Sequence, residues 1–304
     1  MFAREAIFIE PPVRHLRIGV AIATAGRPET VRETVGLLKR QIRAADTVLV
    51  CSPRQEDVEG LCESHPEVVH ILGPRGLPHQ RNRLLDAADD LDVLVFLDDD
   101  FVMAPEYLAE TEAVLAAHPT VVMTTGKVVA DGILGPGLSV ADAEKHLAKS
   151  PATGSLPLVS VYNGYGCNMA VRLTAVRAHH LRFDEQLPLY AWLEDVDFSR
   201  RLAAFGSIVR VSSARGVHLG VKSGRQPGMG LGYAQIANPC YLIAKGTCSW
   251  RKGFFLMSRN FAANVLGTLR GEKAVDRRGR LSGNLRAVLD LMTQRLAPSR
   301  AQHF

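Results

Sequence analysis

The chain has 304 residues, of which 47% are hydrophobic and 22% are charged, as in an ordinary globular protein. This length suffices for one large domain, or for a domain with an appendage. Aromatic residues make up only 6%, so the composition does not favour the base-stacking surface of a nucleic-acid-binding protein. We therefore expect no nucleic acid among its partners.

The cysteines and the first residues bear on the compartment. The five cysteines are odd in number and form no CxxC pair, so they favour neither a disulfide framework nor a zinc site and fit a reducing cytosol. The first 15 residues lack the apolar core and the cleavage site of a signal peptide. No run of 18 residues is both apolar and uncharged, so no membrane-spanning helix is predicted. We expect a cytoplasmic protein.

Short apolar strands alternate with helices in the first half of the chain. Residues 17–24 form an apolar, β-branched run that predicts a buried strand, and a helix follows in which apolar residues recur every three or four positions from Val31 to Ile42. Further strands are predicted at 46–52, 68–73, 92–100 and 121–129, with helices at 78–89 and 105–118. This alternation predicts βαβ units and a mainly parallel sheet, which binds ligands at the carboxyl ends of its strands.

The rhythm breaks over residues 130–160, where Gly and Pro residues indicate loops around one weak helix. An insertion beside a binding site, on the side where an acceptor substrate would enter, fits this segment. An extended segment at 163–172, an amphipathic helix at 191–206 and a strand at 207–219 follow. Beyond residue 220 the pattern is helical, with Gly-rich joints predicted at 224–232 and 279–283.

Three aspartates, Asp98, Asp99 and Asp100, follow five apolar residues at a predicted strand exit. Two carboxylates one residue apart can share a divalent cation, and oxygen ligands suit Mg²⁺ or Mn²⁺, which also bind the oxygens of a substrate diphosphate. The alternative is a polar turn in which an Asp caps the next helix. Because desolvation and mutual repulsion oppose three adjacent acids, we favour the cation site.

A second acidic pair, Glu194 and Asp195, stands at the start of the amphipathic helix, where acids also simply favour the helix dipole. Asp197 shares this segment. The turn before Trp192 makes Asp195 the better candidate for facing a cleft.

Basic and imidazole side chains follow the last predicted strand of this part. His218 at its end is either an ordinary surface residue or a metal ligand. Lys222 and Arg225 flank a Ser-Gly pair, a pattern that suits a diphosphate as well as a solvated loop.

Taken in order, these features resemble family 2 glycosyltransferases of the GT-A fold. The resemblance extends from about residue 17 to about residue 225 and rests on VAIATAGRPETV, HQRNRLL, FLDDD, GYGCNMAVR, WLEDVDFSRRL and the downstream His218. It implies an α/β fold, with a GT-A type, mainly parallel sheet flanked by helices and a C-terminal helical extension. The predicted regions are an N-terminal extension (1–16), a GT-A catalytic domain (17–220) and a basic, helical C-terminal region (221–304).

The resemblance also implies roles for individual residues. Asp98 and Asp100 would bind the metal and, with Asp99, the donor; Asp195 would be the catalytic base and His218 a further metal ligand. The residues implied or suited to hold the nucleotide or donor also include Thr24, Arg27, Arg81, Asn82, Lys222 and Arg225. Those implied near the transferred sugar or the acceptor are Gly166, Asn168, Trp192 and Glu194. Cys51 and Ser52 stand where family members often carry an Asp that contacts the base, and uridine is the default base.

The implied reaction is inversion by direct displacement, in which Asp195 removes the acceptor proton and Mn²⁺ or Mg²⁺ stabilises the departing nucleoside diphosphate. The expected donor is a nucleotide-diphosphate sugar, and the expected acceptor is a hydroxyl of a glycan or a lipid-linked molecule in polysaccharide synthesis. Three alternatives stay open: a haloacid-dehalogenase-type phosphatase, a nucleotidyltransferase and a non-catalytic nucleotide-sugar-binding module. Against the phosphatase, three predicted strands precede the aspartates, whereas that nucleophile usually follows the first strand.

The positive charge is concentrated near the C-terminus. Residues 251–300 contain eleven Lys or Arg and three acids, a local net charge of +8 in a chain of +5. The apolar segment 253–269 is interrupted by Arg259, Asn260 and Asn264, which fits a helix lying in a membrane interface rather than spanning it. We expect peripheral attachment to the anionic inner face of the cytoplasmic membrane. The alternative is packing on the catalytic domain or on the second subunit of a homodimer by Phe254, Phe255, Leu256, Phe261 and Leu266.

Overall fold

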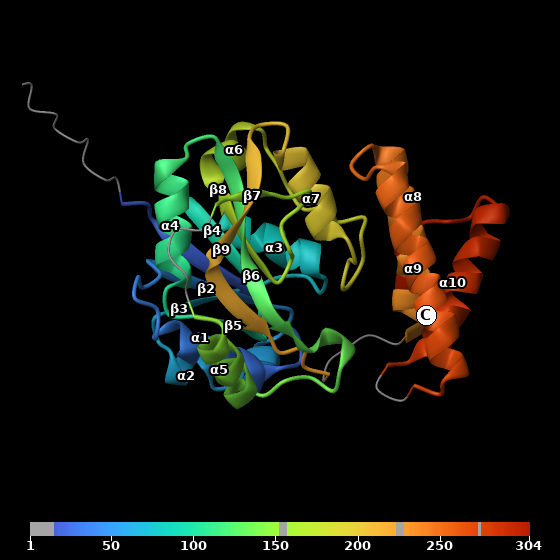
Figure 1. Ribbon diagram of the computed structural model, residues 1–304, viewed down its shortest axis with the longest axis horizontal. Coiled ribbons are helices and arrows are strands. Elements are labelled where there is room, and N and C mark those ends of the chain that lie inside the picture. Colours follow the sequence, from blue (N-terminus) through green and yellow to red (C-terminus); the bar gives the residue numbers. More distant parts are fainter. Residues whose placement is uncertain (1–14, 152–156, 223–227, 273–274) are drawn as a thin grey trace, which may run out of the picture.

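A single β-sheet organises the chain up to residue 218. The computed structural model describes residues 15–151, 157–222, 228–272 and 275–304, and within them nine strands form one sheet. The strand order is β3-β2-β1-β4-β8-β6-β9-β5, with the short β7 paired to β9. Figure 1 shows helices on both faces of this sheet and a separate group of helices at the C-terminus. The expected N-terminal extension lies outside the described residues, apart from its last two positions.

The first half of the sheet is parallel, as predicted. Its strands are β1 (Ile18–Ala23), β2 (Thr47–Ser52), β3 (Val68–Leu72) and β4 (Val93–Asp98). The segments between them form α1 (Pro28–Leu38), η1 (Gln55–Val58), α2 (Leu61–Ser64) and α3 (Leu77–Asp86). Strand β1 pairs in parallel with β2 and β4, so the chain segments that follow β1 and β4 leave the same edge of the sheet.

The second half of the sheet is mixed. Its strands are β5 (Phe101–Met103), β6 (Val121–Asp131), β7 (Val159–Ser160), β8 (Asn168–Arg172) and β9 (Ser207–His218). Its helices are α4 (Tyr107–Ala117), η2 (Gly132–Leu134), α5 (Val140–Lys149), α6 (Leu173–Ala178) and α7 (Glu194–Leu202). β8 runs antiparallel to both β4 and β6, while β6 and β9 are parallel. The predicted α/β sheet flanked by helices is confirmed, with antiparallel strands in this half.

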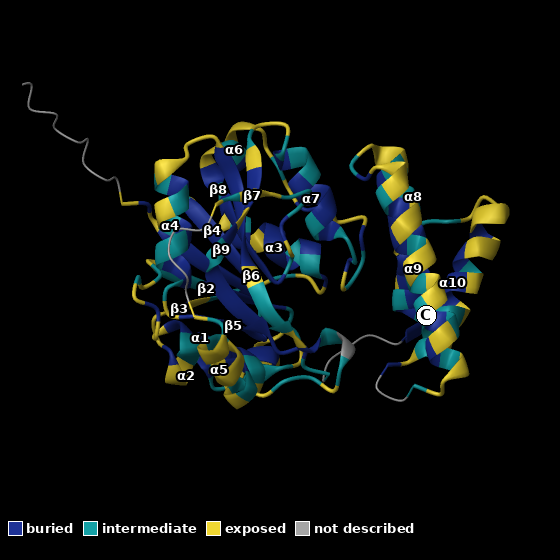
Figure 2. Cartoon of the chain, in the orientation of Figure 1, coloured by how far each residue is buried: buried dark blue, intermediate teal, exposed yellow. Residues whose placement is uncertain are grey.

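Alternating side chains of the strands fill two apolar layers. Val93 and Val95 of β4 pack with α1 and α4 on one face, while Leu94 and Phe96 pack with α3, α6 and α7 on the other. Figure 2 shows the sheet as the buried centre of this part of the molecule. Both faces are covered, which explains why the central strands read as continuous apolar runs.

Two predicted helices are shorter than their sequence pattern. α1 ends at Leu38, and Ile42, which was expected to continue it, is 77% exposed. α7 begins at Glu194 rather than at residue 191, because Ala191 and Leu193 have positive φ angles that turn the chain before the helix. It ends at Leu202.

The C-terminal region is a helical bundle of α8 (Gly228–Lys245), α9 (Trp250–Leu269), α10 (Arg277–Met292) and the short η3 (Pro298–His303). The predicted Gly-rich joints are wrong where the structure describes them, because these glycines lie inside α8 and α10. A Cβ on Gly232 would meet the Arg280 carbonyl oxygen at 2.0 Å. These glycines therefore let the two helices approach closely and do not mark turns. The first four positions of the joint at 224–232 lie outside the described residues.

The outer surface of α9 is apolar and exposed. Phe254 and Phe255 are 64% and 61% exposed, and Phe261 and Leu266 are also exposed, whereas Leu256 faces the bundle and is buried. The expected alternative, packing of this set on the catalytic domain, is therefore wrong for the four exposed side chains. Within the described ranges, the structure has no helix whose length and apolar character would let it cross a membrane.

Candidate metal centre and base

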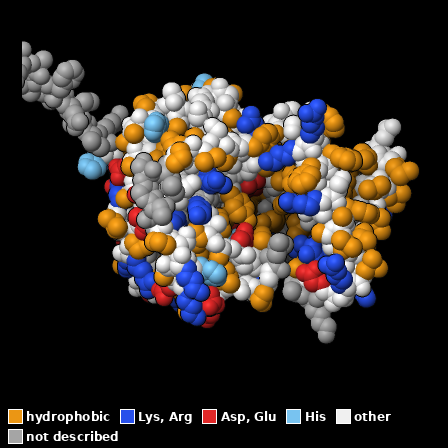
Figure 3. All heavy atoms as spheres, in the orientation of Figure 1, with side chains coloured by type: hydrophobic (Ala, Val, Ile, Leu, Met, Phe, Trp, Pro, Cys, Tyr) orange, Lys and Arg blue, Asp and Glu red, His pale blue; other side chains and the backbone are white. Residues whose placement is uncertain are grey.

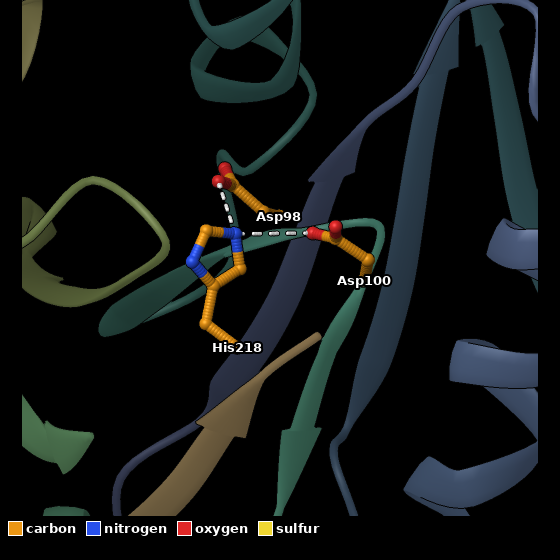
Figure 4. Close-up of side chains that lie close together, drawn as sticks. All are labelled: Asp98, Asp100 and His218. Carbon is orange, nitrogen blue, oxygen red and sulfur yellow. Dashed lines mark ion pairs between the residues drawn. The ribbon is translucent and has the colours of Figure 1, made fainter. Parts of the chain in front are cut away.

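Strand pairing brings the aspartate motif to His218. Asp98 ends β4 and Asp100 immediately precedes β5. β5 pairs antiparallel with β9, with Phe101 opposite His218. As a result the His218 Nε2 atom lies 3.3 Å from Asp100 Oδ1 and 3.8 Å from Asp98 Oδ2, as Figure 4 shows. Residues about 120 positions apart in the sequence thus form one cluster.

This cluster fits a divalent cation. One ligand atom from each of Asp98, Asp100 and His218 lies within 4.8 Å of the others, and Asp100 and His218 are buried. Carboxylate oxygens and an imidazole nitrogen are ordinary ligands of divalent ions. Asp100 is also held by the Val221 backbone N–H, which donates to its Oδ2 at 2.8 Å. The three residues that the sequence predicted as ligands therefore lie together in a group that could hold a metal ion.

Asp131, which the sequence analysis missed, orients the imidazole. It ends β6 and pairs with His218 in the parallel register of β6 and β9, and its Oδ1 lies 3.0 Å from His218 Nδ1. Tyr165 donates a hydrogen bond to its other oxygen at 2.9 Å. Burial alone would lower the pKa of His218, but hydrogen bonds to Asp100 and Asp131 raise it to about 10. In the sequence, the feature that could have identified Asp131 is an acidic residue at the end of a predicted strand, just before a glycine.

Asp99 points away from this cluster. Its buried carboxylate accepts a hydrogen bond from Thr24 Oγ1 at 2.6 Å and pairs with Arg27 at 2.7 Å. Burial raises the pKa of Asp99 to about 7, against the attraction of Arg27. Arg27 also lies 3.8 Å from Asp100. Thr24 and Arg27, which were expected near the nucleotide, therefore join the loop after β1 to the aspartate motif.

Arg81 connects the aspartate motif to the second acidic pair. Its buried guanidinium pairs with Glu194, lies 3.3 Å from Asp98 Oδ1 and donates to the Gly166 carbonyl at 2.7 Å. It lies over the rings of Phe96 and Phe183, at 5.7 and 5.5 Å from their centroids. Arg81 thus contacts residues of three other predicted motifs, namely FLDDD, GYGCNMAVR and WLEDVDFSRRL.

Asp195 is the accessible acid of its segment. Glu194 is buried and paired with Arg81, and Asp197 is fully buried. Asp197 binds Arg201 of its own helix and Lys245 and Thr247 of the C-terminal region. The half-buried Asp195 accepts backbone hydrogen bonds from Gly166 at 3.1 Å and Val196 at 2.8 Å, and burial raises its pKa. A Cβ on Gly166 would lie 3.1 Å from Glu194 Oε1, which is a tight contact.

Two predicted donor or sugar residues face other parts of the protein. The Asn82 amide hydrogen-bonds the backbone of Phe183 and the side chain of Glu185. Asn168 is buried in the sheet, where Thr125 donates to its Oδ1 at 2.7 Å. The structure therefore places both side chains in local supporting networks.

Trp192 contacts the C-terminal region, whereas Lys222 contacts the segment after β6. The Trp192 carbonyl accepts a hydrogen bond from Asn238 of α8 at 2.8 Å. Lys222 donates to the carbonyl groups of Gly132 and Ile133, at 3.0 and 2.9 Å. Arg225 lies outside the described residues.

No model of a protein family matches the sequence, and no curated protein matches it. Solved glycosyltransferase structures do match. The mannosyltransferase PcManGT from Pyrobaculum calidifontis, in complex with GDP-Man and Mn²⁺, is 16% identical with a TM-score of 0.52, over 98% of this chain and 88% of that chain. GalNAc-T7 with UDP, GalNAc and Mn²⁺ is 14% identical with a TM-score of 0.60, over 92% of this chain and 58% of that chain.

The third similar protein is S. aureus TarS. The longer TarS structure is 17% identical with a TM-score of 0.52, over 75% of this chain and 40% of that chain. Its 1–349 fragment in complex with UDP-GlcNAc is 14% identical with a TM-score of 0.57, over 94% and 83%. This chain therefore spans less than two thirds of the longer TarS and GalNAc-T7 chains. At these identities the likeness shows the fold, which is the GT-A fold of glycosyltransferases.

Proposed function

We propose that this protein is a metal-dependent, inverting glycosyltransferase of family 2, which moves a sugar from a nucleotide-diphosphate donor to a hydroxyl group. The observation that carries the proposal is that one buried side chain, Arg81, joins the candidate metal cluster to the segment that holds Asp195. Arg81 contacts Asp98 of the cation cluster and lies in the same hydrogen-bonded group as Gly166 and Asp195. A donor diphosphate bound at the cluster would therefore place its sugar near a carboxylate.

The chain's own residues account for the parts of such a reaction. Asp98, Asp100 and His218 would hold the cation, with Asp131 orienting His218. When bound, the cation supplies positive charge that neutralises the diphosphate of the leaving nucleotide. Asp195 would accept the proton of the acceptor hydroxyl, and its raised pKa brings its basicity closer to what a general base needs.

An inverting reaction agrees with the acids available. Direct displacement needs one base and no covalent intermediate, and Asp195 is the accessible carboxylate of its segment. Glu194 is held by Arg81 and Asp197 by cations and a hydroxyl, so neither is free to act as a nucleophile. Glu194 instead fits the role of a positioning residue beside the transferred sugar.

The identities of the cation and the donor are part of the proposal. One imidazole nitrogen among the ligands departs from an all-oxygen set, which favours Mn²⁺ over Mg²⁺. The similar structures hold GDP-Man, UDP-GlcNAc or UDP, and two of them hold Mn²⁺. We retain a UDP-sugar as the first donor to test, and a glycan or lipid-linked hydroxyl of polysaccharide synthesis as the acceptor.

We also propose that α9 seats the protein on the inner, anionic face of the cytoplasmic membrane. Its outer surface exposes Trp250, Phe254 and Phe255, and Arg251 and Arg259 are exposed on the same helix. Figure 3 shows hydrophobic side chains gathered over the C-terminal helices. Aromatic rings beside arginines suit the headgroup region of an anionic bilayer. A homodimer formed through this surface is the alternative.

The decisive experiment is a thermal-shift panel of nucleotide sugars with Mn²⁺ or Mg²⁺, because a ligand that binds only the native state raises its stability. The stabilising donor is then used with an isotope label. Sugar transfer supports the proposal, whereas pyrophosphate exchange, phosphate release or binding alone would indicate a nucleotidyltransferase, a phosphatase or a binding module. Anomeric stereochemistry of the product, read by NMR, tests inversion separately.

A further inference from the structure

Two cationic side chains, Arg200 and Lys252, lie against the aromatic ring of Tyr162. The Arg200 guanidinium carbon is 4.6 Å from the centroid of the Tyr162 ring, and the Lys252 Nζ atom is 4.0 Å from it. Arg200 belongs to α7, one and a half turns after Asp195, whereas Lys252 comes from the first turn of α9. The C-terminal bundle therefore contributes a side chain to this group.

The group is held in place by hydrogen bonds. Lys252 Nζ donates to Asn163 Oδ1 at 3.0 Å, and Arg200 donates to the Tyr162 carbonyl at 3.2 Å. The Tyr162 hydroxyl accepts from the Ser249 backbone N–H at 3.0 Å. The loop that carries Tyr162 and Asn163 continues to Gly166, whose N–H binds Asp195. The two cations and the base candidate thus all bind the same loop, residues 162–166.

Neither cation has a carboxylate within 4.0 Å among the residues described, although both are half-buried. The neighbouring cations differ, since Arg201 pairs with Asp197, and Lys245 pairs with Asp184 and Asp197. Burial lowers the pKa of Lys252, and the charge of Asp195 acts in the opposite direction. Two half-buried like charges without a paired anion are costly, and a bound oxyanion would remove that cost.

We propose that Arg200 and Lys252 form a subsite for an oxyanion of the acceptor, a phosphate or a carboxylate. This inference rests on the proposed function, because it takes Asp195 as the group that meets the acceptor hydroxyl. The donor diphosphate has its own place at Asp98, Asp100 and His218, so these cations serve the second substrate. Arg supplies a planar fork of donors and Lys a compact charge, a combination suited to oxyanions. The acceptor class is therefore an anionic glycan or a phosphate-linked carrier.

The test uses glycerol 1-phosphate, glycerate and glycerol, which share a carbon chain and differ in the charged group. Each is titrated by ligand-observed NMR into protein loaded with UDP and Mg²⁺. We expect at least one anion to bind about tenfold or more tighter than glycerol, as charge-assisted hydrogen bonds provide. The stronger anion identifies phosphate or carboxylate as the source. The preference should disappear in the double variant Arg200→Gln/Lys252→Gln and return in Arg200→Lys/Lys252→Arg.

Arg251→Gln is the matched control, because Arg251 is an exposed neighbour on the same helix. Equal binding of the three probes to the wild-type protein would overturn the subsite, and so would an equal loss in the Arg251→Gln variant. If the double variant does not fold, the two single variants replace it. Failure of the proposed function has a different signature, namely that the wild-type protein binds no nucleotide sugar with either metal.

Discussion

His218 and Asp131 are joined across neighbouring strands, with the imidazole Nδ1 atom 3.0 Å from a carboxylate oxygen. This contact holds the ring so that Nε2 is turned toward Asp98 and Asp100. A residue that contributes no atom to the cluster therefore sets its geometry.

Replacing this partner should weaken the metal site without removing a ligand. We expect Asp131→Asn to reduce Mn²⁺ affinity by about 10- to 100-fold, as is usual for groups that orient a ligand. Calorimetric titration with Mn²⁺ measures this directly. Glu144→Gln, an exposed acid of α5, is the control and should leave the titration unchanged. Overlaid curves for Asp131→Asn and wild type would show that Asp131 does not orient the metal site.

Metal affinity should rise with pH. The hydrogen bonds to Asp100 and Asp131 outweigh burial and raise the pKa of His218 to about 10, so the imidazole is protonated in the metal-free site at neutral pH. An ion must displace that proton, and its affinity should increase up to about tenfold per pH unit below that pKa. Mn²⁺ titrations between about pH 6 and pH 8 test this. His218→Gln should flatten the dependence, and a flat wild-type profile contradicts the prediction.

Asp195→Asn should fold, bind the nucleotide and lose most of its transfer activity. Asn keeps the shape of the side chain but cannot accept a proton, and a general base contributes about 10²- to 10⁴-fold in rate. Steady-state kinetics and UDP binding measured on the same preparation separate catalysis from binding. A kcat close to that of the wild-type enzyme would move the base to another group.

The contact between α8 and α10 should be intolerant of a single methyl group. A Cβ at Gly232 would meet the Arg280 carbonyl at 2.0 Å, so we expect Gly232→Ala to lower the free energy of unfolding by about 1–3 kcal/mol. Gly135→Ala is the control, because no atom lies within 4 Å of its added carbon and its φ is negative. Urea unfolding of both variants provides the comparison. Equal stability of the two would mean that the helices separate easily.

Membrane attachment should depend on the aromatic residues of α9. We expect the wild-type protein to sediment with anionic vesicles and not with neutral ones, since each cation near the surface contributes about 1 kcal/mol. Phe254→Ser/Phe255→Ser should stay in the supernatant. Leu72→Ser, which changes a side chain 56% exposed on the sheet edge, should bind as the wild type does. Concentration-dependent association, without vesicle binding, would instead identify the surface as a dimer contact.

Local sequence patterns predicted the parallel strands and the candidate metal ligands Asp98 and Asp100, because both depend on short segments. The apolar run before Asp98 fixed a strand and its exit, and the period of α1 was visible from Val31 onward. The end of α1 was not visible in the sequence, because Ile42 continues the apolar spacing although the helix has already ended. Sequence spacing alone does not show where tertiary contacts end a helix.

Contacts between segments far apart in the sequence determine where the residues lie that the sequence analysis missed or expected elsewhere. Asp131 meets His218 only because β6 and β9 run in parallel with bulges that shift their register. Lys252 reaches Tyr162 only through the packing of α9 against the α/β body. Asn168 reads as a site residue in its glycine-rich motif, but strand pairing turns it into the sheet, where it bonds Thr125.

The contacts of Asp197 with the C-terminal bundle determine whether that bundle can be exchanged without disturbing the α/β part of the chain. This fully buried carboxylate, two residues from the base candidate, takes Lys245 and Thr247 from the C-terminal bundle. A chain cut before α8, or a bundle without these two side chains, would leave the carboxylate with Arg201 of its own helix as its remaining ion-pair partner. Any exchange of the C-terminal bundle must therefore keep a cation at position 245 and a hydroxyl group at position 247.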